Sequence, residues 1–249
     1  MSGHSKWATI KRKKAATDSA RGRLFTKLIR ELSIAAREGG GDPEANPRLR
    51  LVITTAKSSN MPAENIKRAI RRGTGELPGI SYEQVVYEGY GPAGIAVLVE
   101  VVTDNKNRAV SEIRHALERY GGKMGELGSV AWTFRRRGVL VVPKNGLDEE
   151  KILTIALEAG AEDLKSEDDY FEITALPENF ESVKKALEEN NIKIESAEMQ
   201  MVPQSTIRVE GKVAEKVLKL MEALEEHDDV QHVFSNFDID DKVMAAFSG

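Results

Sequence analysis

The chain has 249 residues, of which 41% are hydrophobic, and this length allows two or three compact units. A membrane-spanning helix is excluded because no apolar run approaches the ~18 residues that one needs. The cysteine count of 0 excludes disulfides and thiolate metal sites. Residues 1–80 contain 17 Lys and Arg against 7 Asp and Glu, a net charge of +10, whereas the remainder holds 19 against 33, a net charge of −14.

This charge asymmetry indicates a segment that binds a polyanion, joined to an acidic body of different character. The alternative is that the two oppositely charged surfaces dock on each other. The first basic residues are not followed by the apolar segment of a secretory signal. We therefore expect a cytoplasmic protein with no membrane partner.

The basic part begins with residues 1–17, which show no helical or strand period and are predicted to form a flexible arm. Asp18 can cap a helix whose apolar residues recur at helical spacing up to Ala36, and Gly39-Gly40-Gly41 ends it. Asn46-Pro47 starts a second helix toward Ala56, and a third runs from near Pro62 to Gly73. Residues 18–79 are thus predicted to form a three-helix bundle.

From Tyr82 the apolar period changes toward two, which predicts strands at 84–87 and 95–102, a helix at 108–120 and a strand at 129–134. Residues 138–203 then show the β-α-β-β-α-β order of a ferredoxin-like domain. The tail adds a strand at 206–209, a helix at 213–224 and a strand at 230–237. We expect an α+β multidomain protein in which residues 138–203 are inserted into a second ferredoxin-like sandwich, made of residues 80–137 and 204–249.

Several motifs that can carry chemistry favour a structural interpretation. Residues 89–94 match G-x-G-x-x-G, but a strand follows instead of a helix, so the motif predicts a hairpin turn. His227 and His232 lack the spacing of a metal site. No catalytic pair stands out, and we expect neither cofactor nor metal. An enzyme with a site in the 87–108 loops, where Asp104 and Arg108 could meet, is a lower-ranked alternative.

The arm and the bundle supply the side chains that suit a nucleic acid. Lysine and arginine neutralise phosphates, and an exposed indole can stack on a base. Trp7 either stacks in this way or folds back into the bundle as an anchor. The predicted nucleic-acid-binding residues are His4, Lys6, Trp7, Lys11, Arg12, Lys13, Lys14, Arg21, Arg23, Lys27, Arg30, Lys57, Asn65 and Arg68. Other basic residues of the bundle extend the positive field: Arg48, Arg50, Lys67, Arg71 and Arg72.

The chain also resembles the YebC family over essentially its whole length. The matching segments are Gly3-His4-Ser5-Lys6-Trp7, Asp18 with Phe25 and Lys27, Asn60-Met61-Pro62, Tyr87-Glu88-Gly89-Tyr90-Gly91-Pro92, Thr103-Asp104-Asn105, Asn107-Arg108 and Gly128-Ser129-Val130. The resemblance implies an N-terminal helical domain and two ferredoxin-like domains. It also implies a role in gene expression, since bacterial members are described as DNA-binding transcriptional regulators and others as ribosome-associated translational activators.

The sequence therefore predicts a non-enzymatic, nucleic-acid-binding regulator of gene expression, with DNA as the first partner. The alternative is a translation factor that binds ribosomal RNA and relieves stalling during difficult peptide synthesis. The acidic domains are candidates for contact with a protein partner.

Overall fold

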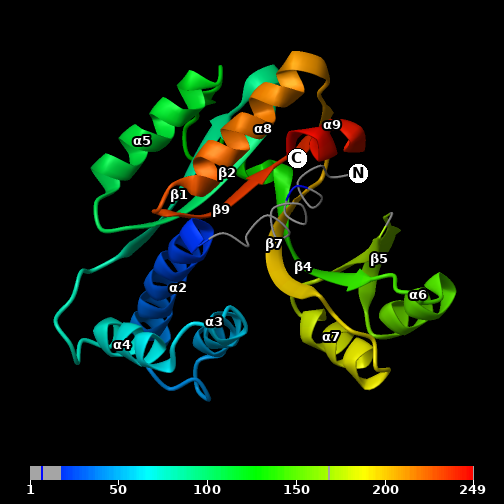
Figure 1. Cartoon of the computed structure of the whole chain (residues 1–249), viewed down its shortest axis with the longest axis horizontal. Coiled ribbons are helices and arrows are strands. Elements are labelled where there is room, and N and C mark those ends of the chain that lie inside the picture. The colour runs from blue at the N-terminus through cyan, green and yellow to red at the C-terminus, as the bar shows by residue number, and fades with distance from the viewer. Residues whose placement is uncertain (1–6, 8–17, 168, 249) are drawn as a thin grey trace. The chain divides into compact units, whose positions relative to one another are not determined.

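The computed structural model describes residue 7 and residues 18–167 and 169–248 (Figure 1). The predicted arm, residues 1–17, lies outside these residues except for Trp7. The chain forms two compact units, one reaching to Trp132 and resuming at Ser205, the other spanning Thr133–Gln204. None of the described helices is long and apolar enough to cross a membrane.

The helical part of the first unit contains α2 (Asp18–Gly39), α3 (Pro47–Ser58) and α4 (Ala63–Gly73). The three predicted helices are therefore present, and each buries its apolar stripe in one shared core that includes Leu32, Leu49 and Ile66. Gly73 allows α4 to approach α2 closely, because a Cβ there would lie 2.3 Å from the carbonyl oxygen of Ser33.

Asn46 starts α3 and joins it to the end of α2. Its Oδ1 accepts from the backbone N–H of Leu49 at 3.0 Å, as an N-cap does. Its Nδ2 donates to the carbonyls of Ala35 and Gly40, both at 2.8 Å. The side chain is buried at 5% exposure, so all three bonds are shielded from water.

The rest of the first unit is an α+β sandwich. Its strands are β1 (Glu83–Tyr90), β2 (Ala96–Thr103), β3 (Lys123–Met124) and β9 (Val230–Ser235), in the antiparallel order β3-β1-β2-β9. The helices α5 (Lys106–Arg119) and α8 (Gly211–Glu226) pack on the face that carries Val97, Val99 and Val101 (Figure 1). The motif at residues 89–94 is the β1–β2 connection, with the short 3-10 helix η1 (Pro92–Gly94), as predicted for a hairpin turn.

The predicted strand at 129–134 is wrong for most of its length. The backbone N–H groups of Gly128, Val130 and Ala131 all donate to the carboxylate of Glu88, at 2.6, 2.7 and 2.8 Å. Because these donors are bound to a side chain, they cannot join a strand ladder. The next strand, β4 (Phe134–Pro143), begins only after the 3-10 turn η2 (Ala131–Thr133).

The predicted strand at 230–237 is divided by Asn236. The Asn236 Oδ1 accepts from the backbone N–H of Ala96 at 2.7 Å, so this side chain takes a bond that would belong to the ladder. β9 therefore ends at Ser235, and β10 (Phe237–Asp238) pairs in parallel with β8 (Ile207–Arg208). The terminal helix α9 (Asp241–Ser248) and the two-residue β3 are not predicted from the sequence.

The second unit contains β4, α6 (Glu149–Glu158), β5 (Ala161–Ser166), β6 (Tyr170–Ala175), α7 (Phe180–Glu189) and β7 (Ser196–Pro203). All pairs in its sheet are antiparallel, in the order β5-β6-β4-β7, which is the arrangement of a ferredoxin-like fold. The helices cover one face, where Leu140, Phe171 and Leu187 are buried together. The predicted α+β class is confirmed.

Replacing Asn46 tests whether this side chain joins α2 to α3. Asn46→Ala removes one cap and leaves the two carbonyls of the α2 end without their donor, so the free energy of unfolding should fall by about 2–3 kcal/mol. Urea denaturation followed by circular dichroism measures the change. Thr54→Ala, which removes an exposed hydroxyl from α3, is the matched control and should change stability by less than about 0.5 kcal/mol. Equal effects of the two substitutions would contradict the role of Asn46.

Candidate nucleic-acid interface

One side of α2 carries three of the predicted nucleic-acid-binding residues. All three point to the C-terminal end of α8 and the short segment that joins it to β9. Arg23 pairs with Glu226 at 3.3 Å, and Lys27 Nζ donates to the carbonyl of Glu225 at 2.6 Å. Arg30 pairs with Asp229 at 2.6 Å. These contacts correct the expectation that the three side chains face a nucleic acid, because their charges are directed at acidic and carbonyl groups of the same chain.

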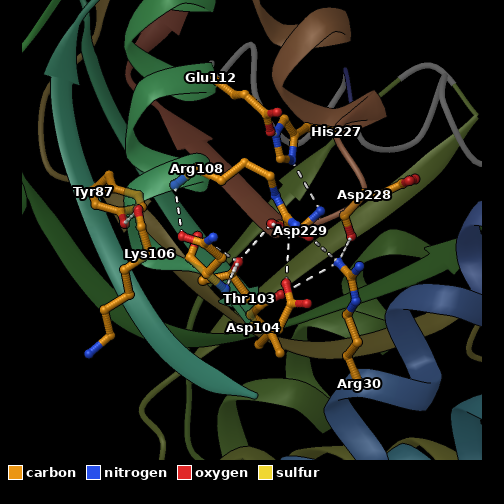
Figure 2. A network of polar contacts seen from close by, with 12 residues as sticks. Arg30, Tyr87, Thr103, Asp104, Lys106, Arg108, Glu112, His227, Asp228 and Asp229 are labelled. Atoms are coloured by element: carbon orange, nitrogen blue, oxygen red, sulfur yellow. Dashed lines mark hydrogen bonds and ion pairs between the residues drawn. The ribbon is translucent and has the colours of Figure 1, made fainter. Parts of the chain in front are cut away.

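Asp229 is the centre of this contact (Figure 2). Its side chain is 2% exposed, and its Oδ1 accepts from Arg30 Nη1. Its Oδ2 accepts from Arg108 Nη2 and from Thr103 Oγ1, both at 2.7 Å. Arg30 also donates to the backbone carbonyl of Asp228. The carboxylate, which directly precedes β9, therefore joins α2 to the C-terminal end of β2 and to the first turn of α5.

The electrostatics of Asp229 favour its charged form. Burial alone raises the pKa of the carboxyl, but the hydrogen bonds from Arg108 and Thr103 and the charges of Arg30 and Arg108 outweigh it and hold the pKa below its ordinary value. Arg108 has its own pKa raised, first by the hydrogen bond to Asp229 and then by the one to Asp104. Both partners are consequently ionised at neutral pH.

The segment Thr103–Arg108 places these groups. Thr103 Oγ1 accepts from the N–H of Asn105 at 3.0 Å, and the Asn105 side chain caps α5 by accepting from the N–H of Arg108 at 3.1 Å. Arg108 thus lies in the first turn of α5, where it also pairs with Asp104 at 2.8 Å. The Asp104–Arg108 contact considered as a possible enzyme site is formed, and Arg108 is shared between Asp104 and Asp229.

His227 supports the same corner. Its Nδ1 accepts from the N–H of Asp229 at 3.1 Å, and its Nε2 lies 2.7 Å from Glu112 on α5. His232 stacks on Phe234 instead, with ring centroids 5.9 Å apart. Over the described residues no group of three His, Asp or Glu side chains is placed to hold a metal ion.

The outer surface of the helical part has a different character. Lys57 on α3 and Arg68 on α4 are exposed, and Asn65 is half-buried. Arg68 belongs to a set that we call the α4 basic face, whose members are Lys67, Arg68, Arg71 and Arg72. All four are exposed, because Ile66 and Ala69 take the buried side of the helix. Arg71 pairs with Glu76 at 3.3 Å, with both side chains more than half exposed.

The position of Trp7 matches neither of the two alternatives drawn from the sequence. Its side chain is 5% exposed and lies in the core of the α+β sandwich, not in the helical bundle, with its ring centroid 6.0 Å from that of Phe247. An indole buried in this way cannot stack on a base, so the expectation of an exposed Trp7 is corrected.

Arg21 is exposed near the start of α2. The predicted residues outside the described part are His4, Lys6, Lys11, Arg12, Lys13 and Lys14.

Sequence reasoning did not identify Asp229 or Glu88. Both are single acidic residues whose importance depends on partners distant in sequence, 199 residues from Arg30 in the first case and 40 from Gly128 in the second. Their positions in the sequence could have indicated them, because Asp229 directly precedes a predicted strand and Glu88 directly follows the alternating residues of another.

The fold and the surface define an α+β protein with a basic helical N-terminal domain and two sheet domains. Residues 5–76 match the TACO1/YebC protein N-terminal domain, and residues 82–237 match the TACO1/YebC second and third domain. The chain belongs to the TACO1/YebC family, which confirms the resemblance drawn from its motifs.

Similar proteins of known sequence and structure agree. A protein of Pelotomaculum thermopropionicum is 55% identical over 97% of this chain and 100% of its own. One of Halothermothrix orenii is 57% identical over 98% of both chains. Both carry the name "Probable transcriptional regulatory protein". The crystal structure of a conserved hypothetical protein, Aq1575 from Aquifex aeolicus, has a TM-score of 0.82 and 48% identity, covering 90% of this chain and 93% of that one.

Removing the Asp229 charge tests the contact around it. Asp229→Asn leaves Arg30 and Arg108 without their anion, and because Arg108 is 42% exposed we expect a loss of only about 2–4 kcal/mol at pH 7. Since the folded pKa of Asp229 is lowered, its contribution is complete above the unfolded pKa of about 3.9 and is lost as pH falls through the folded value. The stability difference should therefore disappear in acid.

Urea denaturation at a series of pH values measures this difference. Asp228→Asn is the matched control, because that neighbouring side chain is exposed and only its backbone carbonyl accepts from Arg30. The control should match the wild type at pH 7. A difference between the wild type and Asp229→Asn that stays constant from pH 7 to pH 2 would contradict the proposed ionisation.

Proposed function

We propose that the protein is a regulator of gene expression that binds a nucleic acid through the α4 basic face and Lys57. The observation that supports this most directly is that Lys57, Lys67, Arg68 and Arg72 are exposed, and that their side chains make no hydrogen bond or ion pair with the described residues. Long cationic side chains that are not used within the chain are available to phosphates, and they release counterions on binding.

The spacing of the α4 basic face favours contact with a phosphate backbone. Its members stand at positions i, i+1, i+4 and i+5, so they lie on one side of the helix over about 7.5 Å of its length. The helix N-terminus is a less favourable anion site because Glu64 stands in its first turn. A phosphate chain is therefore expected to cross the C-terminal half of α4.

Duplex DNA is the first candidate partner, because the curated relatives are named as transcriptional regulatory proteins. Ribosomal RNA is the second candidate, and a structural observation favours it. A helix that reads the major groove presents amide or guanidinium groups to base edges at its start, and α4 offers only Asn65 there, half-buried. Backbone contact without base reading also suits a folded RNA surface.

The network around Asp229 supports a binding protein instead of an enzyme. The Asp229 carboxylate is ionised and already bonded to two arginines, so it is a poor general acid or base at neutral pH. With such a partner, we expect the protein to act in the cytoplasm. The acidic remainder of the chain is available for a protein partner.

Neutralising the α4 basic face tests the proposal. In a variant with Lys67→Gln, Arg68→Gln and Arg72→Gln, three phosphate contacts are lost. The slope of log affinity against log salt should then become shallower by about 3, and affinity for duplex DNA at 0.15 M salt should fall on the order of 100-fold. Fluorescence anisotropy on a labelled duplex measures both, and co-sedimentation with ribosomes gives the parallel result for RNA.

A second variant with the same charge change is the control. Lys212, Lys216 and Lys219 lie exposed on α8, and their replacement by glutamine removes three positive charges from another helix. This control should bind as the wild type does. If both triple variants lose equal affinity, the protein has only a general attraction to polyanions and the proposed interface is wrong.

A further inference from the structure

The segment Gly125–Trp132, which we call the Glu88 loop, carries two very exposed apolar side chains. Leu127 is 88% exposed and Trp132 is 69% exposed. They are the two most exposed large hydrophobic side chains among the described residues. Large apolar side chains are costly to leave in water. An exposed leucine and an exposed tryptophan on one loop therefore indicate a binding surface.

The Glu88 loop is held from beneath by one carboxylate. Glu88, on β1, is 4% exposed, and it accepts from the backbone N–H groups of Gly128, Val130 and Ala131. Its own carbonyl accepts from the N–H of Gly125 at 2.8 Å. Burial raises the pKa of Glu88, but the three N–H donors outweigh it and hold that pKa below its ordinary value. The loop backbone is therefore fixed before any partner arrives.

The direction of the two apolar side chains follows from this anchoring. Val130 is buried at 1% exposure and fills the inner side of the loop. Gly128 has φ +85, a left-handed conformation that favours glycine and turns the chain back toward β1. With the inner side occupied by Val130 and the Glu88 carboxylate, Leu127 and Trp132 are left on the outer side.

The indole of Trp132 has a fixed orientation. Its Nε1 donates to the carbonyl of Ser129 at 3.0 Å, and the Tyr90 hydroxyl donates to the same carbonyl at 3.1 Å. Because the N–H is bonded within the loop, the exposed part of the ring offers an aromatic surface and not a donor. A ring held in this way loses little side-chain entropy on binding, which favours a stacking partner.

One cationic group, the Lys123 ammonium, lies beside the loop and can contact a phosphate. Lys123 is exposed, and its Nζ lies 5.5 Å from the centroid of the Tyr90 ring, whose hydroxyl reaches the loop at Ser129. Glu126 is an exposed acidic residue of the loop itself. The loop thus has both signs of charge, with the ammonium group on the Tyr90 side.

We propose that the Glu88 loop binds an unpaired base of a nucleic acid, which stacks on Trp132 while Leu127 contacts it and Lys123 lies near the adjoining phosphate. This inference rests on the proposed function and adds to it that the bound nucleic acid contains a single-stranded segment. Every base has an aromatic face, so stacking of this kind tolerates any base.

Anisotropy titrations with a single-stranded oligonucleotide and with a duplex of equal charge test the proposal. Trp132→Ala should weaken binding of the single strand by about 5- to 100-fold and leave duplex binding unchanged. Its salt dependence should not change, because no charge is removed. Leu157→Ala, which truncates a 49% exposed leucine on α6, is the matched control and should bind both as the wild type does.

Trp132→Phe supplies a readout that a folding defect would not produce. It retains an aromatic ring and should keep most of the affinity, but it removes the exposed indole while Trp7 remains buried. Single-strand binding should therefore quench the tryptophan fluorescence of the wild type and not that of Trp132→Phe. This pair of results identifies stacking on Trp132 directly.

Two results overturn the inference. The first is unchanged single-strand affinity of Trp132→Ala, the outcome expected if Leu127 and Trp132 dock a protein instead. The second is wild-type quenching that persists in Trp132→Phe. The proposed function is judged separately, because it depends on the loss of duplex or ribosome binding in the Lys67, Arg68 and Arg72 variant.

Discussion

The buried carboxylate of Asp229 is the interaction on which the first unit depends. It receives one arginine from α2 and one from α5, and a hydroxyl from the end of β2. The helix α2 and the consecutive elements β2 and α5 therefore meet at one anion that is distant from them in sequence. Taking a carboxylate out of water is unfavourable unless such partners compensate for it. The motif Thr103-Asp104-Asn105 with Arg108 is explained by this requirement, since it caps α5 and places the arginine at the carboxylate.

This contact divides the basic residues of the helical part into two groups. Arg23, Lys27 and Arg30 are directed inward and hold the bundle against the α8–β9 segment. The α4 basic face is directed outward and is not used in that attachment. The charge asymmetry of the sequence therefore has two causes. Oppositely charged parts dock on one side of the bundle, and the exposed cationic surface on the other side is the one that we propose binds a nucleic acid.

The sequence predicted the helices and most strands because their signals are local. Asn46-Pro47 marks a helix start by capping chemistry, and the alternation after Tyr82 marks strands. The prediction of strands failed where a side chain distant in sequence accepts the backbone N–H groups that would otherwise pair in a sheet. Glu88 does this at residues 128–131, and Asn236 does it at Ala96. For the candidate site, charge indicated the helical domain, and contact of Lys57 and Arg68 with a nucleic acid stays a prediction. Composition could not show that Arg30 is paired with Asp229 or that Trp7 is buried.

The outward face of α3 and α4 is the surface that we propose contacts the nucleic acid. Protection of lysines from acetylation, measured by mass spectrometry on the full chain with and without duplex DNA or ribosomes, tests it most directly. Lys57 and Lys67 should become protected in the complex, while the exposed Lys212 and Lys216 of α8 should be modified as in the free protein. Protection of Lys212 and Lys216 with unchanged modification of Lys57 and Lys67 would contradict it.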